Sequence, residues 1–436
     1  MRSEFPARRR FAIPGLFAAL LLFAGGASAQ RAPAKQADPA EEAGEKPKIR
    51  AITAFINLDP QNNAQQIAEA VKTLKYAKTV FESRGYEVQT IRISTQPFPL
   101  YTKGMSAEAA LDFFRRYDAL AEKEGFDASI GPAMLNADSP ASEAELIPEI
   151  IRSTKILNAS VVVAGDDGVR WPAIGAAARV MKALAEGTEH SQGNFRFSAI
   201  AMVPPLTPFY PGSYNVGFGR QFGIALQSAN VVAAAFRDAP DLETARRKLT
   251  DSLGKHAFAI QFLAERIDRD MGWTYAGIDL SPAPLKDVSI GEAIENLTEE
   301  PFGSSGTLTA AATITAGLKA IGVKQSGYSG LMLPILEDGR LAQRWSEGRV
   351  TLDALLSYSA VCGTGLDTVP LPGDISEQQL ALIIGDMASL AFKWRKPLSA
   401  RLLPVAGKSA GERSEFDDPF LVNAVLQPLS SPAGKP

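Results

Sequence analysis

The sequence is poor in residues that bind metals or form cross-links, with one cysteine, Cys362, and two histidines in 436 residues. A single cysteine cannot form an internal disulfide, so the folded chain must depend on its apolar core for stability. One cysteine and two histidines also cannot supply the usual ligand set of a zinc or iron–sulfur site. The sequence therefore leaves the metal and the cofactor undefined.

An excess of positive charge is also missing, because 45 lysines and arginines face 48 aspartates and glutamates, for a net charge of -3. Nucleic-acid-binding proteins normally carry a basic stripe, and none is visible here. We therefore expect no nucleic-acid partner. The composition is 46% hydrophobic, which is enough for a sizeable core, whereas the oligomeric state is left open.

The first 29 residues have the order of a cleavable export signal: arginines at 8–10, an apolar stretch at 11–23, and Ala-Ser-Ala at 27–29. A retained anchor is the alternative, but a membrane span needs about 20 strongly apolar residues, and this stretch is interrupted by Pro14. We expect a periplasmic or extracellular protein with no stable span after cleavage. The paired arginines make the twin-arginine route one candidate.

Residues 30–47 are mostly Ala, Pro, Glu and Lys, which cannot bury enough apolar surface to fold, so we expect a disordered tether there. Residues 48–430 are expected to form one domain. In its first half, expected strands alternate with amphipathic helices, which predicts βαβ crossovers and a mainly parallel sheet or barrel. The strands are expected at 49–57, 88–93, 128–130 and 159–164, and the helices at 64–84, 107–123 and 142–153.

The second half begins with expected strands at 195–203 and 214–227, joined by a proline-rich connector whose path the prolines fix. A long amphipathic helix at 241–271 follows, and its apolar stripe predicts packing on the core. The pattern of strand, loop and helix then returns, with an expected strand at 275–280. The chain as a whole is expected to be an α/β protein.

Four stretches of the last third carry a resemblance to a known family: 276–284 (AGIDLSPAP), 305–311 (SGTLTAA), 326–334 (SGYSGLMLP) and 361–367 (VCGTGLD). Together they resemble the family called domain of unknown function 711, whose members are named pyruvate formate-lyase-like. The resemblance implies the fold of glycyl radical enzymes, a ten-stranded α/β barrel with a loop entering its centre. It implies little about activity, because a shared barrel does not fix chemistry.

The chain differs from glycyl radical enzymes in one clear respect. The chain lacks the C-terminal Arg-Val-x-Gly-Tyr-like segment on which a glycyl radical forms, and export to an oxygen-exposed compartment also disfavours such a radical. We therefore expect no glycyl radical.

Three residues are candidates for catalysis: Cys362, Asp279 and Asp367. The thiol of Cys362 precedes a Gly-Thr-Gly loop whose amides would favour a thiolate or bind an anion, although a lone cysteine is also often a buried small hydrophobe. Asp279 and Asp367 each follow an apolar run just before a loop. They could perform acid–base chemistry or hold a hard cation, or they could only cap a helix or close a turn.

Another set of residues is expected to bind a ligand. Arg92 interrupts an apolar strand, so it is either an anion receptor or half of a buried ion pair. A helix is expected to begin near Gly306, where free amides and the helix dipole could receive a carboxylate or phosphate, or where a polar side chain only caps the helix. The full set is Arg92, Ser281, Gly306, Thr307, Gly363 and Gly365.

The sequence thus favours an exported α/β barrel that binds a small polar or anionic molecule at its loop ends, and it leaves open whether the protein is an enzyme. One alternative is a non-catalytic periplasmic binding or scaffold protein. The other is a metal-dependent hydrolase that uses aspartate pairs.

Overall fold

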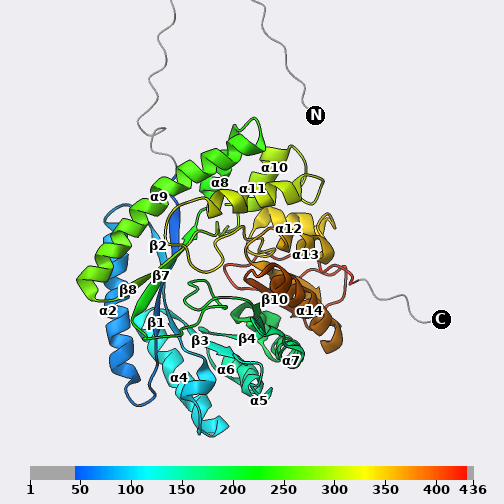
Figure 1. The fold of residues 1–436 in the computed structure, drawn as a ribbon. Helices are drawn as coiled ribbons and strands as arrows, with labels where there is room; N and C mark the ends of the chain where they lie inside the picture. The colour runs from blue at the N-terminus through cyan, green and yellow to red at the C-terminus, as the bar shows by residue number, and fades with distance from the viewer. Residues whose placement is uncertain (1–44, 430–436) are drawn as a thin grey trace, which may run out of the picture. The chain divides into compact units, whose positions relative to one another are not determined.

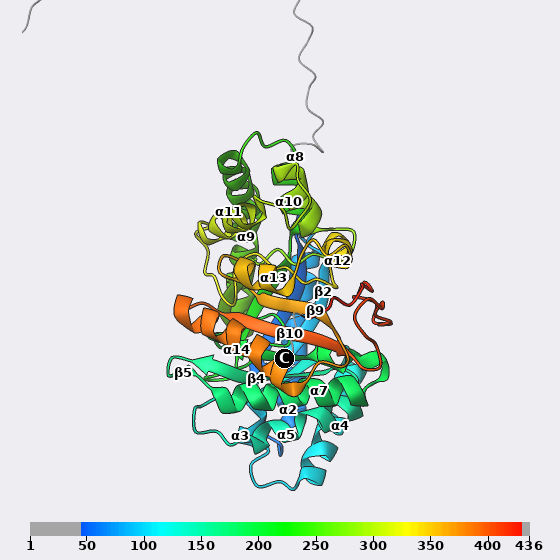
Figure 2. The same ribbon diagram turned by 90° about the vertical axis from the view of Figure 1, so that its right-hand side faces the viewer.

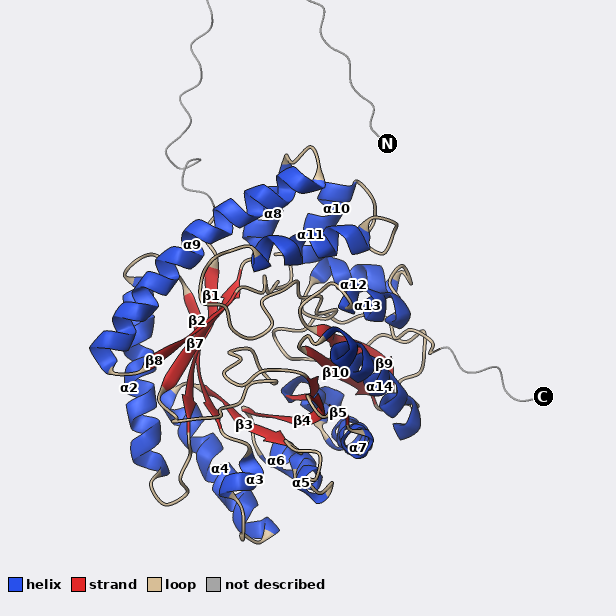
Figure 3. Ribbon diagram, viewed as in Figure 1, coloured by secondary structure: helices blue, strands red, loops and turns tan. Residues whose placement is uncertain are grey.

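The computed structural model describes residues 45–429, so the expected export signal and most of the expected tether lie outside the described residues. The expected α/β fold class is confirmed. Helices form an outer layer around a strongly curved sheet, and irregular segments occupy the space inside it (Figure 1 and Figure 3).

Within the described residues, ten strands belong to one sheet. In chain order they are β1 (Lys48–Ile56), β2 (Val88–Thr95), β3 (Asp127–Ala133), β4 (Leu157–Gly165), β5 (Gly168–Val169), β6 (Phe197–Ala201), β7 (Gln221–Gln227), β8 (Thr274–Asp279), β9 (Gly365–Pro372) and β10 (Leu398–Val405).

The order of the strands in the sheet is β8-β7-β1-β2-β3-β4-β6-β10-β9, with the short β5 paired to β4 alone. The five central strands, β1, β2, β3, β4 and β6, are parallel. The outer strands β7 and β10 run antiparallel to their central neighbours, and β8 and β9 follow them in parallel. The N-terminal ends of the central strands therefore lie at the same end of the barrel as the C-terminal ends of the outer strands.

The barrel is not closed by hydrogen bonds between β8 and β9. Segment 323–337 lies in this gap, where Gln325 bridges Ile278 of β8 and Pro334 bridges Asp367 of β9, both in parallel. A continuous ladder is absent from this part of the described chain because proline has no N–H to donate and the glycines at 327 and 330 favour irregular backbone.

Helices cover the outer face of the sheet. Figure 2 shows strands β9 and β10 side by side and flanked by helices α13 and α14, and these helices also contact these strands. The α-helices are α2 (Asn63–Glu82), α3 (Phe98–Tyr101), α4 (Ala107–Glu124), α5 (Ser142–Glu145), α6 (Ile147–Ser153), α7 (Trp171–Gly187), α8 (Ala229–Arg237), α9 (Leu242–Met271), α10 (Ile290–Thr298), α11 (Thr307–Lys319), α12 (Gly339–Ser346), α13 (Leu352–Ser359) and α14 (Glu377–Trp394), and a 3₁₀ segment, η1, spans Glu189–Arg196.

The inside of the barrel is filled by two irregular segments more than by strand side chains. A small apolar cluster there joins inward strand residues such as Ala51 and Ile200 to Phe209 and Tyr214 of segment 204–220 and to Met332 of segment 323–337. Some inward strand positions are small, such as Ala51 and Ala225, which leaves room for these segments. They in turn leave a cavity near one end of the barrel.

The expected strand at 214–227 is shorter in the structure, because only residues 221–227 form β7. The backbone N–H of Asn215 donates to the carbonyl of Thr95 at 2.9 Å, and its side-chain amide donates to Asn57 Oδ1 at 2.7 Å. Gly219, at φ 75°, lies so close to Asn57 that an added Cβ would be 2.5 Å from the Asn57 nitrogen. These contacts hold the residues before β7 as a loop across the ends of β1 and β2.

Candidate functional site

A cavity of about 270 Å³ opens inside the barrel near the N-terminal ends of the central strands. Its wall combines residues of β1, β2, β3, β4, β6, β9 and β10 with residues of the two interior segments and of the C-terminal stretch after β10. Most of its polar lining is charged. A concave pocket with a few convergent polar groups is the usual form of a small-molecule site.

Three arginines of the wall lie over aromatic rings. Such stacking contributes about 0.5–2 kcal/mol and fixes the plane of the guanidinium, which leaves its N–H edges available for other partners. The pairs, with the distance from the guanidinium carbon to the ring centre, are Arg50 over Phe420 at 4.7 Å, Arg92 over Tyr210 at 4.7 Å and Arg401 over Phe195 at 4.9 Å.

Arg50, on β1, has little to compensate its charge. Its one side-chain hydrogen bond goes to Gln89 Oε1 at 3.3 Å, and no carboxylate of residues 45–429 lies within ion-pair distance of it. Burial and the nearby charge of Arg92 lower the pKa of Arg50 to about 10. The guanidinium is still charged at neutral pH, and a bound anion would offset the free-energy cost of its partial desolvation.

Arg92, on β2, was expected to be either an anion receptor or half of an ion pair, and the structure shows features of both. Its Nε donates to Thr90 Oγ1 at 3.0 Å and lies 3.6 Å from Asp127 Oδ2. The Arg92 side chain is buried and lines the cavity, while the Asp127 side chain is 40% exposed. A carboxylate at this distance and with this exposure compensates only part of the charge of a buried guanidinium. The wall formed by Arg50 and Arg92 therefore carries spare positive charge and spare N–H donors.

Arg401, on β10, is fully paired. Its Nε donates to Asp367 Oδ1 at 2.7 Å, and another guanidinium nitrogen donates to Glu337 Oε1. Burial raises the pKa of Glu337, and the Arg401 charge acts in the opposite direction. Two carboxylates thus share one guanidinium at this wall of the cavity.

Asp279, at the end of β8, accepts hydrogen bonds on both carboxylate oxygens. Oδ1 accepts from Ser281 Oγ at 2.7 Å and from the Ser329 amide at 2.9 Å, and Oδ2 accepts from the Tyr328 amide at 2.8 Å. Ser281 Oγ in turn accepts from the Gly330 amide at 3.2 Å. Burial raises the pKa of Asp279, whereas these donors lower it. Asp279 and Ser281 thus bind segment 323–337 to β8 and are not part of the cavity lining.

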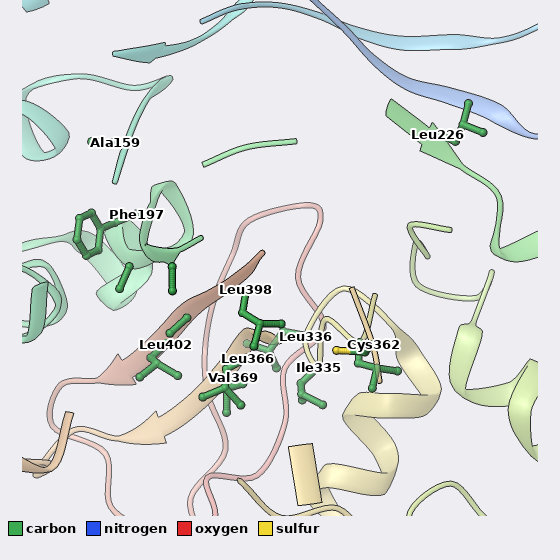
Figure 4. Packing of buried hydrophobic residues seen from close by; sticks show 14 of the residues in the cluster. Ala159, Phe197, Leu226, Ile335, Leu336, Cys362, Leu366, Val369, Leu398 and Leu402 are labelled. Carbon is green, nitrogen blue, oxygen red and sulfur yellow. The ribbon is translucent and has the colours of Figure 1, made fainter. Parts of the chain in front are cut away.

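Cys362 lies in the main apolar cluster with 1% of its surface exposed, near Ile335, Leu336 and Leu366 (Figure 4). Its thiol is not part of the cavity wall. This placement matches the second of the two interpretations given for it, that of a small buried hydrophobe.

The glycines around Cys362 allow backbones to approach closely. An added Cβ at Gly363 would lie 2.7 Å from the Gly330 Cα, and one at Gly365 would lie 2.5 Å from the Ser399 carbonyl oxygen. Both glycines therefore serve the packing of segment 323–337 and β10 against β9. Their expected role in binding a ligand stays a prediction.

Gly306 and Thr307 begin α11, as the sequence indicated. Gly306 is the N-cap residue at φ 100°, and Thr307 Oγ1 accepts a hydrogen bond from the Gly303 amide at 3.0 Å. Neither residue lines the cavity, so the structure brings only Arg92 and Asp367 of the expected site residues together there. Asp367 lies within β9, whereas the sequence had placed it at the end of an apolar run, just before a loop.

The sequence interpretation missed Arg50, Glu337 and Arg401. Arg50 and Arg401 carry the signal that identified Arg92, a charged residue inside an apolar strand. Glu337 carries no such signal, because it lies in an irregular segment, 64 residues before its partner Arg401.

We expect Cys362→Ala to lower the free energy of unfolding by about 1 kcal/mol, the cost of a small cavity in an apolar cluster. It is expected to leave ligand binding in the cavity unchanged. Chemical denaturation and titration of the variant with the same ligand check both points. A loss of binding without a loss of stability would return Cys362 to the list of functional residues.

No three His, Cys, Asp or Glu residues converge as a metal-binding group anywhere in residues 45–429. None of the helices in this part of the chain combines the length and apolar character needed to cross a bilayer.

The fold and the site define an open α/β barrel with a charged interior cavity. The family model described as "Uncharacterised ACR (DUF711)" matches residues 43–418, and the chain belongs to this family. A UPF0210 protein of Pyrobaculum islandicum is 31% identical over 394 residues, which are 84% of this chain and 86% of that protein. Another, of Methanopyrus kandleri, is 30% identical over 84% of this chain and 88% of its own length.

Among solved structures, the chain is similar to the anaerobic ribonucleotide reductase from Thermotoga maritima, crystallised with dATP and CTP. The likeness has a TM-score of 0.38 and 9% identity, and it covers 83% of this chain and 79% of that one.

Proposed function

We propose that this protein binds a small anionic molecule in the barrel cavity, with the acidic group of the ligand at Arg50 and Arg92. The observation that carries the proposal is the pair of arginines on β1 and β2, Arg50 half-buried and Arg92 buried, which has one partial carboxylate partner, Asp127. Buried charges are normally paired, because an unpaired one is costly. A carboxylate or phosphate would compensate this pair and use its free N–H groups.

The other lining residues support a ligand with an apolar part. Phe209, Tyr210, Tyr328 and Met332 face the same cavity as the arginines. An acidic group held by arginines and a hydrocarbon part held by aromatic side chains form the mixed lining that small-molecule sites commonly have.

Binding is favoured over the alternative of an aspartate-based, metal-dependent hydrolase. Asp279 is held by hydrogen-bond donors of the loops around it, and Asp367 is paired with Arg401. The two carboxylates therefore have different structural partners, and only Asp367 faces the cavity.

Thermal unfolding with a panel of anions tests the proposed binding. Phenylacetate, malonate and inorganic phosphate cover an aromatic acid, a diacid and a phosphate of suitable size. A ligand that binds the native state alone raises Tm in proportion to the logarithm of its concentration above Kd. We expect at least one anion to do so while sodium chloride at equal ionic strength does not. A panel without any such shift would contradict the proposal.

We also propose that the protein acts after export, in the periplasm or outside the cell. The support is the order of basic, apolar and small residues in 1–29. N-terminal sequencing of the protein from its native cells should begin at Gln30, just after the Ala-Ser-Ala stretch. A mature protein that still begins at Met1 would contradict cleavage.

A further inference from the structure

The wall that faces the cavity from β9 and segment 323–337 has the opposite character to the Arg50 and Arg92 wall. Glu337 and Asp367 are both nearly fully buried and share the single charge of Arg401. The two carboxylates and one guanidinium leave this wall with an excess of negative charge. The wall on β1, β2 and the start of β3 has Arg50, Arg92 and Asp127, which leaves an excess of positive charge.

The carboxylates also have unused acceptors. Both contacts of Arg401 with Asp367 go to Oδ1, and its contact with Glu337 goes to Oε1. Within residues 45–429, Asp367 Oδ2 and Glu337 Oε2 accept no hydrogen bond, although both side chains line the cavity. Neither oxygen is among the buried side-chain atoms that lack a partner, so both are accessible, and a ligand in the cavity that supplies donors can reach them.

A buried hydroxyl near these carboxylates gives independent evidence. Thr364, just before β9, has 1% of its surface exposed and lines the same cavity. Its Oγ1 is buried and has no hydrogen-bond partner among the described residues. An unpartnered hydroxyl costs free energy unless a ligand group reaches it.

The two walls belong to one cavity. Arg50, Arg92, Glu337 and Asp367 all line the same space of about 270 Å³. One small molecule can therefore contact both walls at once.

We infer that the ligand is zwitterionic, with its acidic group at Arg50 and Arg92 and a cationic amine at Glu337 and Asp367. This inference rests on the proposed function, because it concerns the same cavity and keeps the acidic group at the same arginines. The chemical class is that of amino acids, either α-amino acids or ω-amino acids.

Matched probes on one carbon skeleton separate the two charges of such a ligand. One set is phenylalanine, 3-phenylpropanoate and 2-phenylethylamine, and a second set is 5-aminopentanoate, pentanoate and pentylamine. Calorimetric titration of the full chain gives a Kd for each probe. We expect the zwitterion of at least one set to bind about tenfold or more tightly than both of its single-charge analogues, as charge-assisted hydrogen bonds would produce.

The outcomes distinguish this inference from the proposed function. If the acid of each set binds as tightly as the zwitterion, the inference is wrong and anion binding at the arginines stands. If no probe with an acidic group binds, the inference is wrong, and the anion panel described above decides the proposed function. If an amine binds as tightly as its zwitterion, the anion proposal fails at the arginine wall and the inference fails with it.

A variant of the acidic wall gives the second arm of the test. Glu337→Gln keeps the size of the side chain and removes its charge, so we expect the affinity for the zwitterion to fall to that for the acid alone. Asp367→Asn serves the same purpose if the first variant does not fold, as judged by its circular dichroism and Tm. Glu347→Gln is the matched control, because Glu347 is also paired with an arginine, Arg344 at 2.7 Å, but lies outside the cavity. A Glu337 variant that folds and still prefers the zwitterion would overturn the inference.

Discussion

Replacing Asp338 by alanine is expected to lower the free energy of unfolding by about 3–5 kcal/mol, because several buried donors lose their acceptor at roughly 1–3 kcal/mol each. Asp338 is fully buried, and burial raises its pKa against the effect of the hydrogen bonds. Its carboxylate accepts from Ser289 Oγ at 2.6 Å, from the Ile290 amide at 2.7 Å and from the Leu341 amide at 3.0 Å. One side chain thus holds the N-terminal ends of α10 and α12 together.

The matched control is Asp241→Ala. Asp241 is also an N-cap aspartate, at the start of α9, and its Oδ1 accepts from the Thr244 amide at 2.7 Å, but it is exposed. An exposed cap is worth about 1 kcal/mol, so denaturant unfolding should show a clearly smaller loss for this variant. Equal losses in the two variants would mean that the buried network of Asp338 contributes nothing beyond an ordinary cap.

The Asp338 network also concerns the site. Asp338 follows Glu337 directly, so the bonds that fix Asp338 also fix the backbone that presents Glu337 to the cavity. A partly destabilised Asp338 variant is therefore expected to show weaker binding of any ligand that contacts Glu337.

Replacing Arg50 by glutamine is expected to weaken anion binding by about 30-fold or more, equivalent to at least about 2 kcal/mol for a buried charged contact. Glutamine keeps the hydrogen-bonding capacity of an amide and removes the charge. Little loss of stability is expected, because the half-buried guanidinium has no carboxylate partner in the described chain to leave unpaired. Calorimetric titration of wild type and variant with the same anion measures the change.

Arg220→Gln is the control for this variant. Arg220 also lies over an aromatic ring, Trp273 at 5.7 Å, and pairs with Glu69 at 3.2 Å, but it lies outside the barrel cavity. We expect its affinity for the anion to stay within about twofold of wild type, below the effect of any single lost hydrogen bond. Similar losses in both variants would indicate a general effect of net charge, and no specific site at Arg50.

Local patterns in the sequence were enough to predict the α/β class and several of the strands and helices, mainly in the first half of the chain. The apolar run of β1 and the spaced apolar residues of α2 and α9 predicted those elements to within a few residues of their observed ends. The strand expected at 214–227 was too long, because residues 214–220 make tertiary contacts that alternation of apolar residues does not reveal. Local patterns also could not predict the position of segment 323–337, because its bridges form with β8 and β9, which are distant in the sequence.

The residues that line the cavity could be predicted only in part, because they lie far apart in the sequence and are brought together by the fold of the barrel. Arg92 could be found, since a charge inside an apolar strand needs a partner or a ligand. Asp367 was selected for its place before a presumed loop, and its actual partner, Arg401, lies 34 residues away on another strand. The amides around Gly363 suggested an anion site, but the contact of that glycine with Gly330 depends on a close backbone crossing that only the fold defines.

A crystal structure of the protein with the tightest-binding anion of the panel is the most direct test of anion binding at Arg50 and Arg92. We expect density in the barrel cavity, with oxygens of the acidic group within about 3 Å of guanidinium nitrogens of both arginines. An acidic group bound elsewhere, for example at the start of α11 beside Gly306 and Thr307, with the cavity arginines unchanged, would contradict it.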